Sequence, residues 1–214
     1  MSEGFVMKKF VAIINYGMGN VDSVKRAIEE CGGNAAITDD PGIISSATHV
    51  VLPGVGNFKE GMNNLKSRNL VPVLTDQVIR ERKPFLGICL GMQLCAKRGR
   101  EGGGEDGLGW IDGEVRRFVP DIPGIRIPHI GWNNVILPKS HPLFDGIPSG
   151  KDFYFVHSYH LTGCPDENII SYTPYCGCFV SSVGRGNIHG LQFHPEKSQK
   201  VGFQLLRNFL RMEG

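Results

Sequence analysis

The chain has 214 residues, of which 41% are hydrophobic and 21% charged. These proportions are typical of a globular protein and not of a disordered one. Lysine and arginine outnumber aspartate and glutamate by 23 to 21, a balance that gives no strong attraction to nucleic acid or to an anionic membrane. The longest apolar stretch near the start, Phe10–Ile14, is far shorter than a membrane-spanning helix or a secretory signal core. We therefore expect a cytoplasmic protein with no nucleic-acid or membrane partner.

Six cysteines lie at positions 31, 89, 95, 164, 176 and 178. Because this number is low for a disulfide-stabilised domain, we expect free thiols in a reducing compartment. One glycine separates Cys176 from Cys178, a spacing that suits a metal ion. No cysteine or histidine pair at zinc-ligand spacing completes such a site, so we expect no bound metal.

The first half of the chain alternates apolar runs with helical patterns, and clusters of its 29 glycines separate them. Asn20 stands where the first helix should begin and is a favourable N-cap residue. Strands that alternate with helices predict a mostly parallel sheet covered on both faces. The predicted strands are residues 10–15, 35–38, 49–52 and 84–88, and the predicted helices are residues 20–31, 58–68, 71–82 and 90–97.

The second half of the chain is richer in strands, and one helix closes it. The absence of an internal repeat or a linker predicts a single domain, residues 10–214, after an extension of residues 1–9 that carries no pattern. The predicted strands are residues 114–118, 134–137, 153–161, 169–173, 179–183 and 188–193, and the final helix buries Val201, Leu205, Leu206, Phe209 and Leu210.

The segment Gly87-Ile-Cys89-Leu-Gly91 stands where an apolar strand meets a helix. A cysteine in this position is typical of a nucleophile on a strained turn, whose flanking glycines let strand and helix pack closely. The N-terminus of the following helix favours the thiolate and offers N–H groups to a developing oxyanion. The alternative for Cys89 is an ordinary buried core cysteine.

A cysteine nucleophile needs a base, and the base needs an orienting group. Of the seven histidines, His194 closes the apolar run of residues 188–193 and is followed by Pro195 and Glu196. Because residues i and i+2 of an extended chain point the same way, the carboxylate of Glu196 is expected beside the ring of His194. An exposed turn explains this short motif equally well when it is taken alone.

Taken together, these motifs make the chain similar to the class I glutamine amidotransferases, and within them to the glutaminase subunits of imidazole glycerol phosphate synthases. The similarity runs from about Phe10 to Leu210. The motifs that carry it, in order, are Asn15-Tyr-Gly-Met-Gly-Asn20, Pro53-Gly-Val-Gly56, Pro84-Phe-Leu-Gly-Ile-Cys-Leu-Gly-Met-Gln-Leu94, His129-Ile-Gly-Trp-Asn133, Phe153-Tyr-Phe-Val-His-Ser-Tyr159 and Gln192-Phe-His-Pro-Glu-Lys-Ser198.

The resemblance implies a flavodoxin-like α/β fold and a Cys-His-Glu triad of Cys89, His194 and Glu196 that hydrolyses L-glutamine to glutamate and ammonia. It implies that the backbone N–H of Leu90 and one from the Pro53–Gly56 turn hold the oxyanion. Within that turn, the residues concerned are Gly54 and Val55.

Four further residues match positions that contact glutamine in the family: Gln93, Glu101, Ser158 and Tyr159. Gln93 lies one turn after the nucleophile on the same helix face. For Ser158 and Tyr159, one face of a half-buried strand remains an alternative.

The resemblance also implies a partner, because a chain of this length has no room for a synthase domain. The expected partner is a (β/α)8 cyclase subunit that receives the ammonia and makes imidazole glycerol phosphate and an aminoimidazole carboxamide ribonucleotide in histidine biosynthesis. Asn20, Trp132 and Lys197 match family positions at that heterodimer interface. The alternatives are exposed polar surface for Asn20 and Lys197, and core for Trp132. No organic cofactor is expected, since a thiolate and a triad suffice.

Three other functions remain open at this point. A paralogous glutaminase would supply ammonia to a surface-polysaccharide sugar, and the unusual Cys176 and Cys178 are compatible with such a divergent branch. A free-standing hydrolase of γ-glutamyl compounds would need no partner. A binding subunit without catalysis would not be expected to retain Cys89, His194 and Glu196 together.

Overall fold

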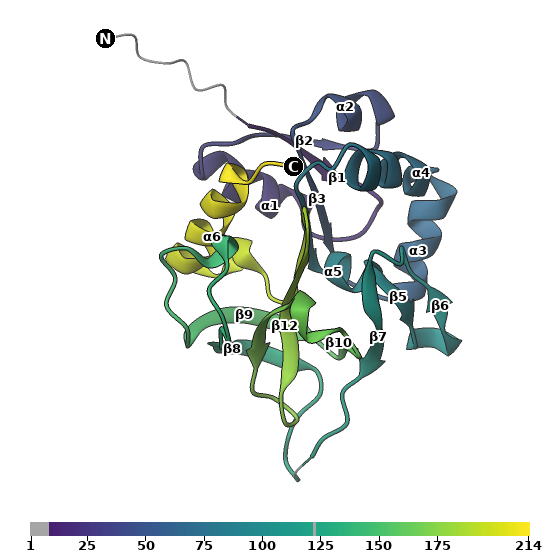
Figure 1. The fold of residues 1–214 in the computed structure, drawn as a ribbon. Helices are drawn as coiled ribbons and strands as arrows, with labels where there is room; N and C mark the ends of the chain where they lie inside the picture. Colours follow the sequence, from purple (N-terminus) through teal and green to yellow (C-terminus); the bar gives the residue numbers. More distant parts are fainter. Residues whose placement is uncertain (1–8, 122) are drawn as a thin grey trace.

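A central sheet organises the fold in the computed structural model, which describes residues 9–121 and 123–214. Within these residues the sheet has seven strands in the order β11-β12-β13-β4-β3-β1-β2 (Figure 1). The strands from β13 to β2 are parallel to one another, and β12 pairs in antiparallel fashion with β13 on one side and with the edge strand β11 on the other. The predicted mostly parallel sheet is confirmed. The bounds are β1 (Phe10–Ile14), β2 (Asn34–Thr38), β3 (His49–Gly54), β4 (Phe85–Cys89), β11 (Ile169–Thr173), β12 (Phe179–Arg185) and β13 (Ile188–Leu191).

The predicted extension of residues 1–9 falls, for residues 1–8, outside the described residues. None of the helices in the described ranges is long and apolar enough to cross a membrane. The helices are α1 (Val21–Glu30), α2 (Pro41–Ser46), α3 (Phe58–Ser67), α4 (Leu70–Thr75), α5 (Leu90–Leu94) and α6 (Gln199–Arg211), and the short π and 3-10 segments are η1 (Asp76–Arg80), η2 (Glu101–Gly103), η3 (Pro142–Phe144), η4 (Asp166–Asn168) and η5 (Pro195–Lys197).

Helices cover both faces of the sheet (Figure 1). On one face α3, α4 and α5 place Phe58, Leu70 and Leu90 in one buried apolar cluster. On the other face α1 and α6 place Ile28 and Phe209 in a second cluster. Strand β1 contributes alternate residues to the two clusters, as the pleat of a strand buried on both faces requires.

Two smaller sheets form most of the strand-rich second half. Within the described residues, a four-stranded sheet has the order β10-β7-β5-β6, and β8 and β9 form an antiparallel pair. Both lie beyond one end of the central sheet (Figure 1). Their bounds are β5 (Ala96–Gly99), β6 (Glu105–Asp106), β7 (Ile111–Arg117), β8 (His129–Val135), β9 (Lys151–His157) and β10 (Tyr159–Thr162).

Several predicted bounds differ in the structure: the strand predicted for residues 188–193 ends at Leu191, and the one predicted for residues 134–137 is the end of β8, which begins at His129. Two further differences have a clear tertiary cause. The helix predicted for residues 90–97 ends at Leu94, because the carbonyls of Leu94 and Ala96 accept hydrogen bonds from Leu108 and Gly109 and the chain continues as β5. The strand predicted for residues 153–161 breaks at Ser158, because β9 pairs with β8 whereas β10 pairs with β7. Tertiary pairing overrides the local pattern at both places.

The junction of β4 and α5 packs more tightly than any side chain would permit. A Cβ on Gly91 would overlap the carbonyl oxygen of Leu52 on β3, and a Cβ on Gly87 would lie 2.7 Å from the backbone of Gly91. The glycines therefore allow the first turn of α5 to lie directly against the ends of β3 and β4.

Replacement of Gly91 by alanine should lower the free energy of unfolding by about 3 kcal/mol, because the backbone of α5 must move away from Leu52. Urea unfolding measures this loss. The matched control is Gly163→Ala: a Cβ there meets no atom within 4 Å, and its φ of +68° costs only about 1 kcal/mol. Equal losses for the two variants would show that the close approach is not a constraint on the fold.

Candidate active site

Cys89 lies at the last position of β4, directly before α5, with a φ of 53° and a ψ of −108°. A residue with a side chain is strained in this backbone conformation, which persists because β3, β4 and α5 fix the backbone around it. The expected strand-to-helix turn is therefore present. The side chain is 5% exposed, so the thiol meets a small opening and not bulk solvent.

His194 and Glu196 form a buried hydrogen-bonded pair. The His194 Nδ1 lies 2.8 Å from the Glu196 Oε1, and their side chains are 3% and 2% exposed. This burial rules out the exposed turn that the short motif alone allowed. A carboxylate and an imidazole so far from water stabilise each other only as an oriented pair.

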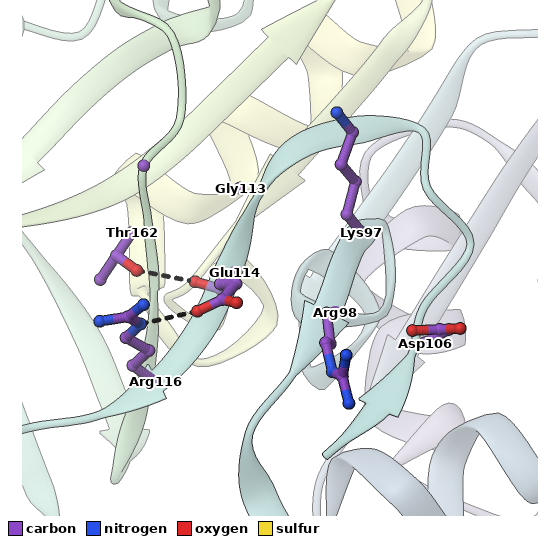
Figure 2. Close-up of a pocket in the computed structure, with 8 residues that line it drawn as sticks. Lys97, Arg98, Asp106, Gly113, Glu114, Arg116 and Thr162 are labelled. Atoms are coloured by element: carbon purple, nitrogen blue, oxygen red, sulfur yellow. Dashed lines mark hydrogen bonds and ion pairs between the residues drawn. The ribbon is translucent and has the colours of Figure 1, made fainter.

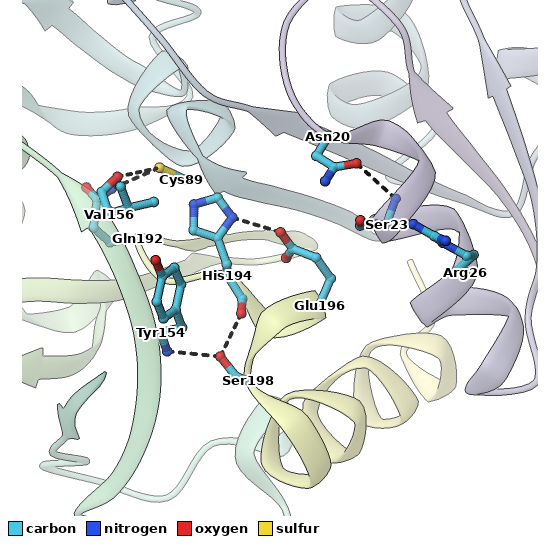
Figure 3. A network of polar contacts seen from close by, with 10 residues as sticks. All are labelled: Asn20, Ser23, Arg26, Cys89, Tyr154, Val156, Gln192, His194, Glu196 and Ser198. Atoms are coloured by element: carbon cyan, nitrogen blue, oxygen red, sulfur yellow. Dashed lines mark hydrogen bonds and ion pairs between the residues drawn. The ribbon is translucent and has the colours of Figure 1, made fainter. Parts of the chain in front are cut away.

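The second ring nitrogen of His194 points toward the sulfur of Cys89 (Figure 3). Among the described residues, this buried Nε2 finds no hydrogen-bond partner within ordinary limits. Burial by itself lowers the pKa of His194, but the negative charge of the Cys89 thiolate and the bonded carboxylate of Glu196 outweigh it and raise the pKa to about 10. The charges around it thus favour a protonated imidazole beside the sulfur of Cys89.

Backbone contacts hold this histidine in place. The His194 N–H donates to the Tyr154 carbonyl at 2.9 Å. The Ser198 hydroxyl donates to the His194 carbonyl at 2.6 Å and accepts from the Tyr154 N–H at 3.1 Å (Figure 3). Strand β9, which contains Tyr154, therefore fixes the position of His194.

A cavity of about 210 Å3 opens onto the thiol. Of the residues predicted for the site, the structure brings six to its walls. The full lining is Val55, Gly56, Cys89, Leu90, Gln93, Val156, His157, Ser158 and Tyr159. The volume and the polar groups suit a small amino-acid substrate.

The predicted oxyanion turn lies beside the nucleophile because β3 and β4 are parallel and in register. Gly54 is the register partner of Cys89, and its α-carbon packs so closely on the Tyr16 hydroxyl and on Leu90 that a Cβ would overlap the hydroxyl. Val55 follows it into the cavity wall.

Glu101 is the one predicted substrate residue that does not line the cavity. Its Oε2 accepts a hydrogen bond of 2.8 Å from the backbone N–H of Phe58, at the first turn of α3. In this arrangement the carboxylate anchors the segment that follows the Val55 turn.

Gln192 was not predicted as a site residue, although the structure places it against the thiol. Its Nε2 donates to the Cys89 Sγ at 3.7 Å, and its Oε1 accepts from the Gln93 Nε2 at 3.0 Å. The signal was available: Gln192 stands two residues before His194, so the same alternation that pairs His194 with Glu196 turns it toward the site.

The three predicted interface residues lie outside the cavity, and two of them contact one aromatic ring. The rings of Trp132 and Tyr154 lie 6.0 Å apart, and the Lys197 Nζ is 5.7 Å from the Tyr154 ring centroid. Trp132 is 46% exposed, which rules out the core alternative. The Asn20 side chain accepts from the Ser23 N–H and caps α1, as predicted.

A second, larger hollow of about 480 Å3 lies on the four-stranded sheet (Figure 2). Three of the charged residues that line it are held in ion pairs: Glu114 pairs with Arg116 at 2.7 Å and also with Arg100, and Lys97 pairs with Asp112 at 2.6 Å. No group of three His, Cys, Asp or Glu residues that could hold a metal ion occurs in the described part of the chain. The reactive groups therefore gather at Cys89.

Fold and cleft together define a class of protein, the α/β hydrolytic enzymes that use a cysteine activated by an oriented histidine. The family follows from comparison with known proteins. The model of the family described as glutamine amidotransferase class-I matches residues 12–212, and the chain belongs to this family.

Two curated relatives resemble the chain along almost its whole length. Imidazole glycerol phosphate synthase subunit HisH 1 of Campylobacter jejuni (strain RM1221) is 46% identical over 94% of this chain and 100% of its own length. Subunit HisH of the same synthase from Moorella thermoacetica is 47% identical over 93% of both chains.

Solved structures support the fold. A putative GMP synthase protein from Thermoplasma acidophilum matches with a TM-score of 0.71 at 21% identity, and the match covers 95% of this chain and 92% of that one. PurLQS from Thermotoga maritima also matches with a TM-score of 0.71, at 17% identity over 95% of this chain and 98% of that one.

Replacement of Cys89 by alanine should lower the pKa of His194 well below about 10, because one of its two anionic neighbours is lost while the burial remains. A pKa raised on folding means that this proton stabilises the fold below the ordinary histidine range. The contribution disappears as the pH rises through the folded-state pKa.

An NMR titration of the histidine rings between pH 6 and 10.5 measures this change. His189 serves as an internal control, because burial lowers its pKa to about 4 and it should stay neutral in both proteins. A wild-type His194 that titrates near the ordinary pKa of about 6.5 would contradict the charged pair.

Proposed function

We propose that this chain is the glutamine-hydrolysing subunit of an imidazole glycerol phosphate synthase. The observation that carries the proposal is the buried His194–Glu196 pair, which faces the strained thiol of Cys89 at the mouth of a small polar cavity. The names of relatives 46–47% identical to the chain support this acceptor pathway over the surface-polysaccharide alternative.

In the first half of the reaction, the Cys89 thiolate attacks the side-chain carbonyl carbon of glutamine. The carbon–nitrogen bond then breaks as His194 gives its proton to the departing nitrogen, so that ammonia leaves and a γ-glutamyl thioester remains on Cys89. The backbone N–H groups of Leu90 and of the Gly54–Val55 turn stabilise the negative oxygen of the tetrahedral intermediate.

In the second half, His194 is neutral and takes a proton from water. The resulting hydroxide attacks the thioester carbonyl, the carbon–sulfur bond breaks, and glutamate leaves as the Cys89 thiolate and protonated His194 return. Glu196 keeps its bond to the His194 Nδ1 throughout, which fixes the ring and stabilises its charged form.

The cavity walls bind the rest of the substrate. Gln93, Ser158 and Tyr159 lie around the opening and offer an amide, a hydroxyl and backbone groups to the charged amino-acid end of glutamine. Glu101 acts from behind the Val55 turn through its bond to Phe58.

The partner in this proposal is a (β/α)8 cyclase subunit, with which the chain forms a cytoplasmic heterodimer. Trp132, Tyr154, Lys197 and Asn20 are the proposed contact surface. The Tyr154 backbone holds His194, so a partner bound to the Tyr154 side chain is separated from the catalytic base by this single residue. The ammonia then has a short path to the second protein.

Glutamate release by the purified chain, alone and then together with the ribonucleotide acceptor and the cyclase subunit, tests the proposal. Low release alone and strong stimulation in the complex are expected. Full activity of the chain alone would favour a free-standing γ-glutamyl hydrolase. If no glutamate is released in either condition although the Cys89 thiol is intact, this acceptor is excluded and the sugar pathway becomes the alternative.

Replacement of Cys89 by alanine should reduce glutamate release at least about 10⁴-fold, because no other group is placed to form the thioester. Binding of the cyclase subunit, measured by calorimetry, should be unchanged. Cys178→Ala is the control, since this thiol is exposed and free. Residual turnover near the wild-type rate would remove Cys89 from the mechanism.

Replacement of Lys197 by alanine should weaken stimulation by the cyclase partner and leave the unfolding free energy within about 0.5 kcal/mol, because the side chain is exposed and lies over Tyr154. Lys200→Ala, an exposed lysine on the first turn of α6, is the matched control. Equal stimulation of both variants would place Lys197 outside the interface.

A further inference from the structure

Two buried histidines, His157 in the cavity wall and His129 in contact with it, have no part in the mechanism above. His129 on β8 and His157 on β9 are register partners and are 4% and 6% exposed. The His129 Nδ1 lies 3.1 Å from the His157 Nε2. Their rings pack among Phe118, Phe155 and Phe179, where apolar side chains would pack equally well. A buried polar pair in such surroundings needs a reason.

The hydrogen bonds around the two rings allow one arrangement of protons. The Tyr159 carbonyl only accepts, so the His157 Nδ1, 2.8 Å away, carries the hydrogen. The His157 Nε2 must then accept from the His129 Nδ1. On the far side, the Asn133 Nδ2 donates to the Pro174 carbonyl at 3.0 Å and lies 3.2 Å from the His129 Nε2, which accepts.

Burial supports this assignment because it keeps both rings neutral. It lowers the pKa of His129 to about 4 and that of His157 to about 3. A neutral imidazole donates with one nitrogen and accepts with the other, so each bond in the series fixes the next tautomer.

The series continues from the Tyr159 carbonyl to the thiol. That carbonyl also accepts from the Gln93 Nε2 at 2.9 Å. The same nitrogen donates to the Gln192 Oε1, and the Gln192 Nε2 donates to the Cys89 Sγ. An unbroken series of hydrogen bonds thus runs from Asn133, next to the exposed Trp132, to the reacting sulfur.

We propose that His129 and His157 are positioning residues for the glutaminase reaction, which set the Tyr159 carbonyl and, through Gln93 and Gln192, the Cys89 sulfur. This inference rests on the proposed function. Loss of the His129 donor leaves the buried Nε2 of His157 without a partner, so the ring of His157 must move to find one. The Tyr159 carbonyl, to which the His157 Nδ1 donates, then moves with the ring, and the wall of the cavity and the Gln93 amide shift.

The test compares three variants of the full chain in complex with the cyclase subunit. His129→Phe keeps the aromatic packing and removes the donor, so kcat should fall about tenfold. His129→Asn places an amide N–H near the lost Nδ1 and should restore most of the rate. His49→Phe is the matched control, because His49 is 1% exposed and packs against Phe209 far from the cleft.

Thermal unfolding of the same proteins separates positioning from stability. His129→Phe and His49→Phe are expected to lose similar stability, while only the first loses turnover. Equal kcat for these two variants would overturn the proposal, as would a His129→Asn variant as slow as His129→Phe.

Two measurements on the chain alone do not depend on the proposed function. A nitrogen–nitrogen scalar coupling across the hydrogen bond is expected between the His129 Nδ1 and the His157 Nε2, and a His157 protonated on Nε2 would contradict the series. Iodoacetamide should alkylate Cys89 several-fold more slowly in His129→Phe, because Gln192 no longer holds the thiolate. If the wild-type complex releases no glutamate, the proposed function fails, and an unchanged alkylation rate would separately overturn the positioning role.

Discussion

The close approach of Gly91 to the Leu52 carbonyl is the constraint on which the rest of the site depends. It lets α5 begin directly at the end of β4, and this junction holds Cys89 in a backbone conformation that a residue with a side chain rarely adopts. Because β3 and β13 flank β4 in parallel, the Gly54–Val55 turn at the end of β3 and His194 after β13 reach the same edge of the sheet. The polar groups of the site lie close together because the topology brings the ends of these three strands to one place.

The charges around His194 then determine whether its imidazole is protonated beside the thiol. Burial disfavours a charged imidazole, yet the Glu196 carboxylate and the thiolate together outweigh that cost and hold the proton on His194. An imidazolium of this kind is poised to give its proton to a leaving amine. The buried surroundings strengthen each charge interaction, so the position of the Cys89 sulfur relative to the ring becomes the sensitive quantity. Gln192 and the Val156 carbonyl are the neighbours that restrain this sulfur.

The sequence predicted what is encoded locally. The turn at Cys89, the pairing of His194 with Glu196 and the Asn20 cap each depend on residues within four positions of one another. Helix α2 was missed although Asp40 accepts from Gly42 and Ile43 and Pro41 follows it, a local signal. Other features depend on strand pairing between distant segments, which the hydrophobic periodicity of one sequence does not reveal. They are the end of α5 at Leu94, the break at Ser158 and the His129–His157 pair.

The central claim is that Cys89 carries the glutamyl group during turnover. Acid quenching of the complex while it hydrolyses glutamine, followed by mass spectrometry of the peptides, tests this claim most directly. We expect a glutamyl thioester on the peptide that contains Cys89, and an unmodified peptide when alanine replaces this cysteine. Steady glutamate release with Cys89 unmodified, or with the glutamyl group on another cysteine, would contradict it.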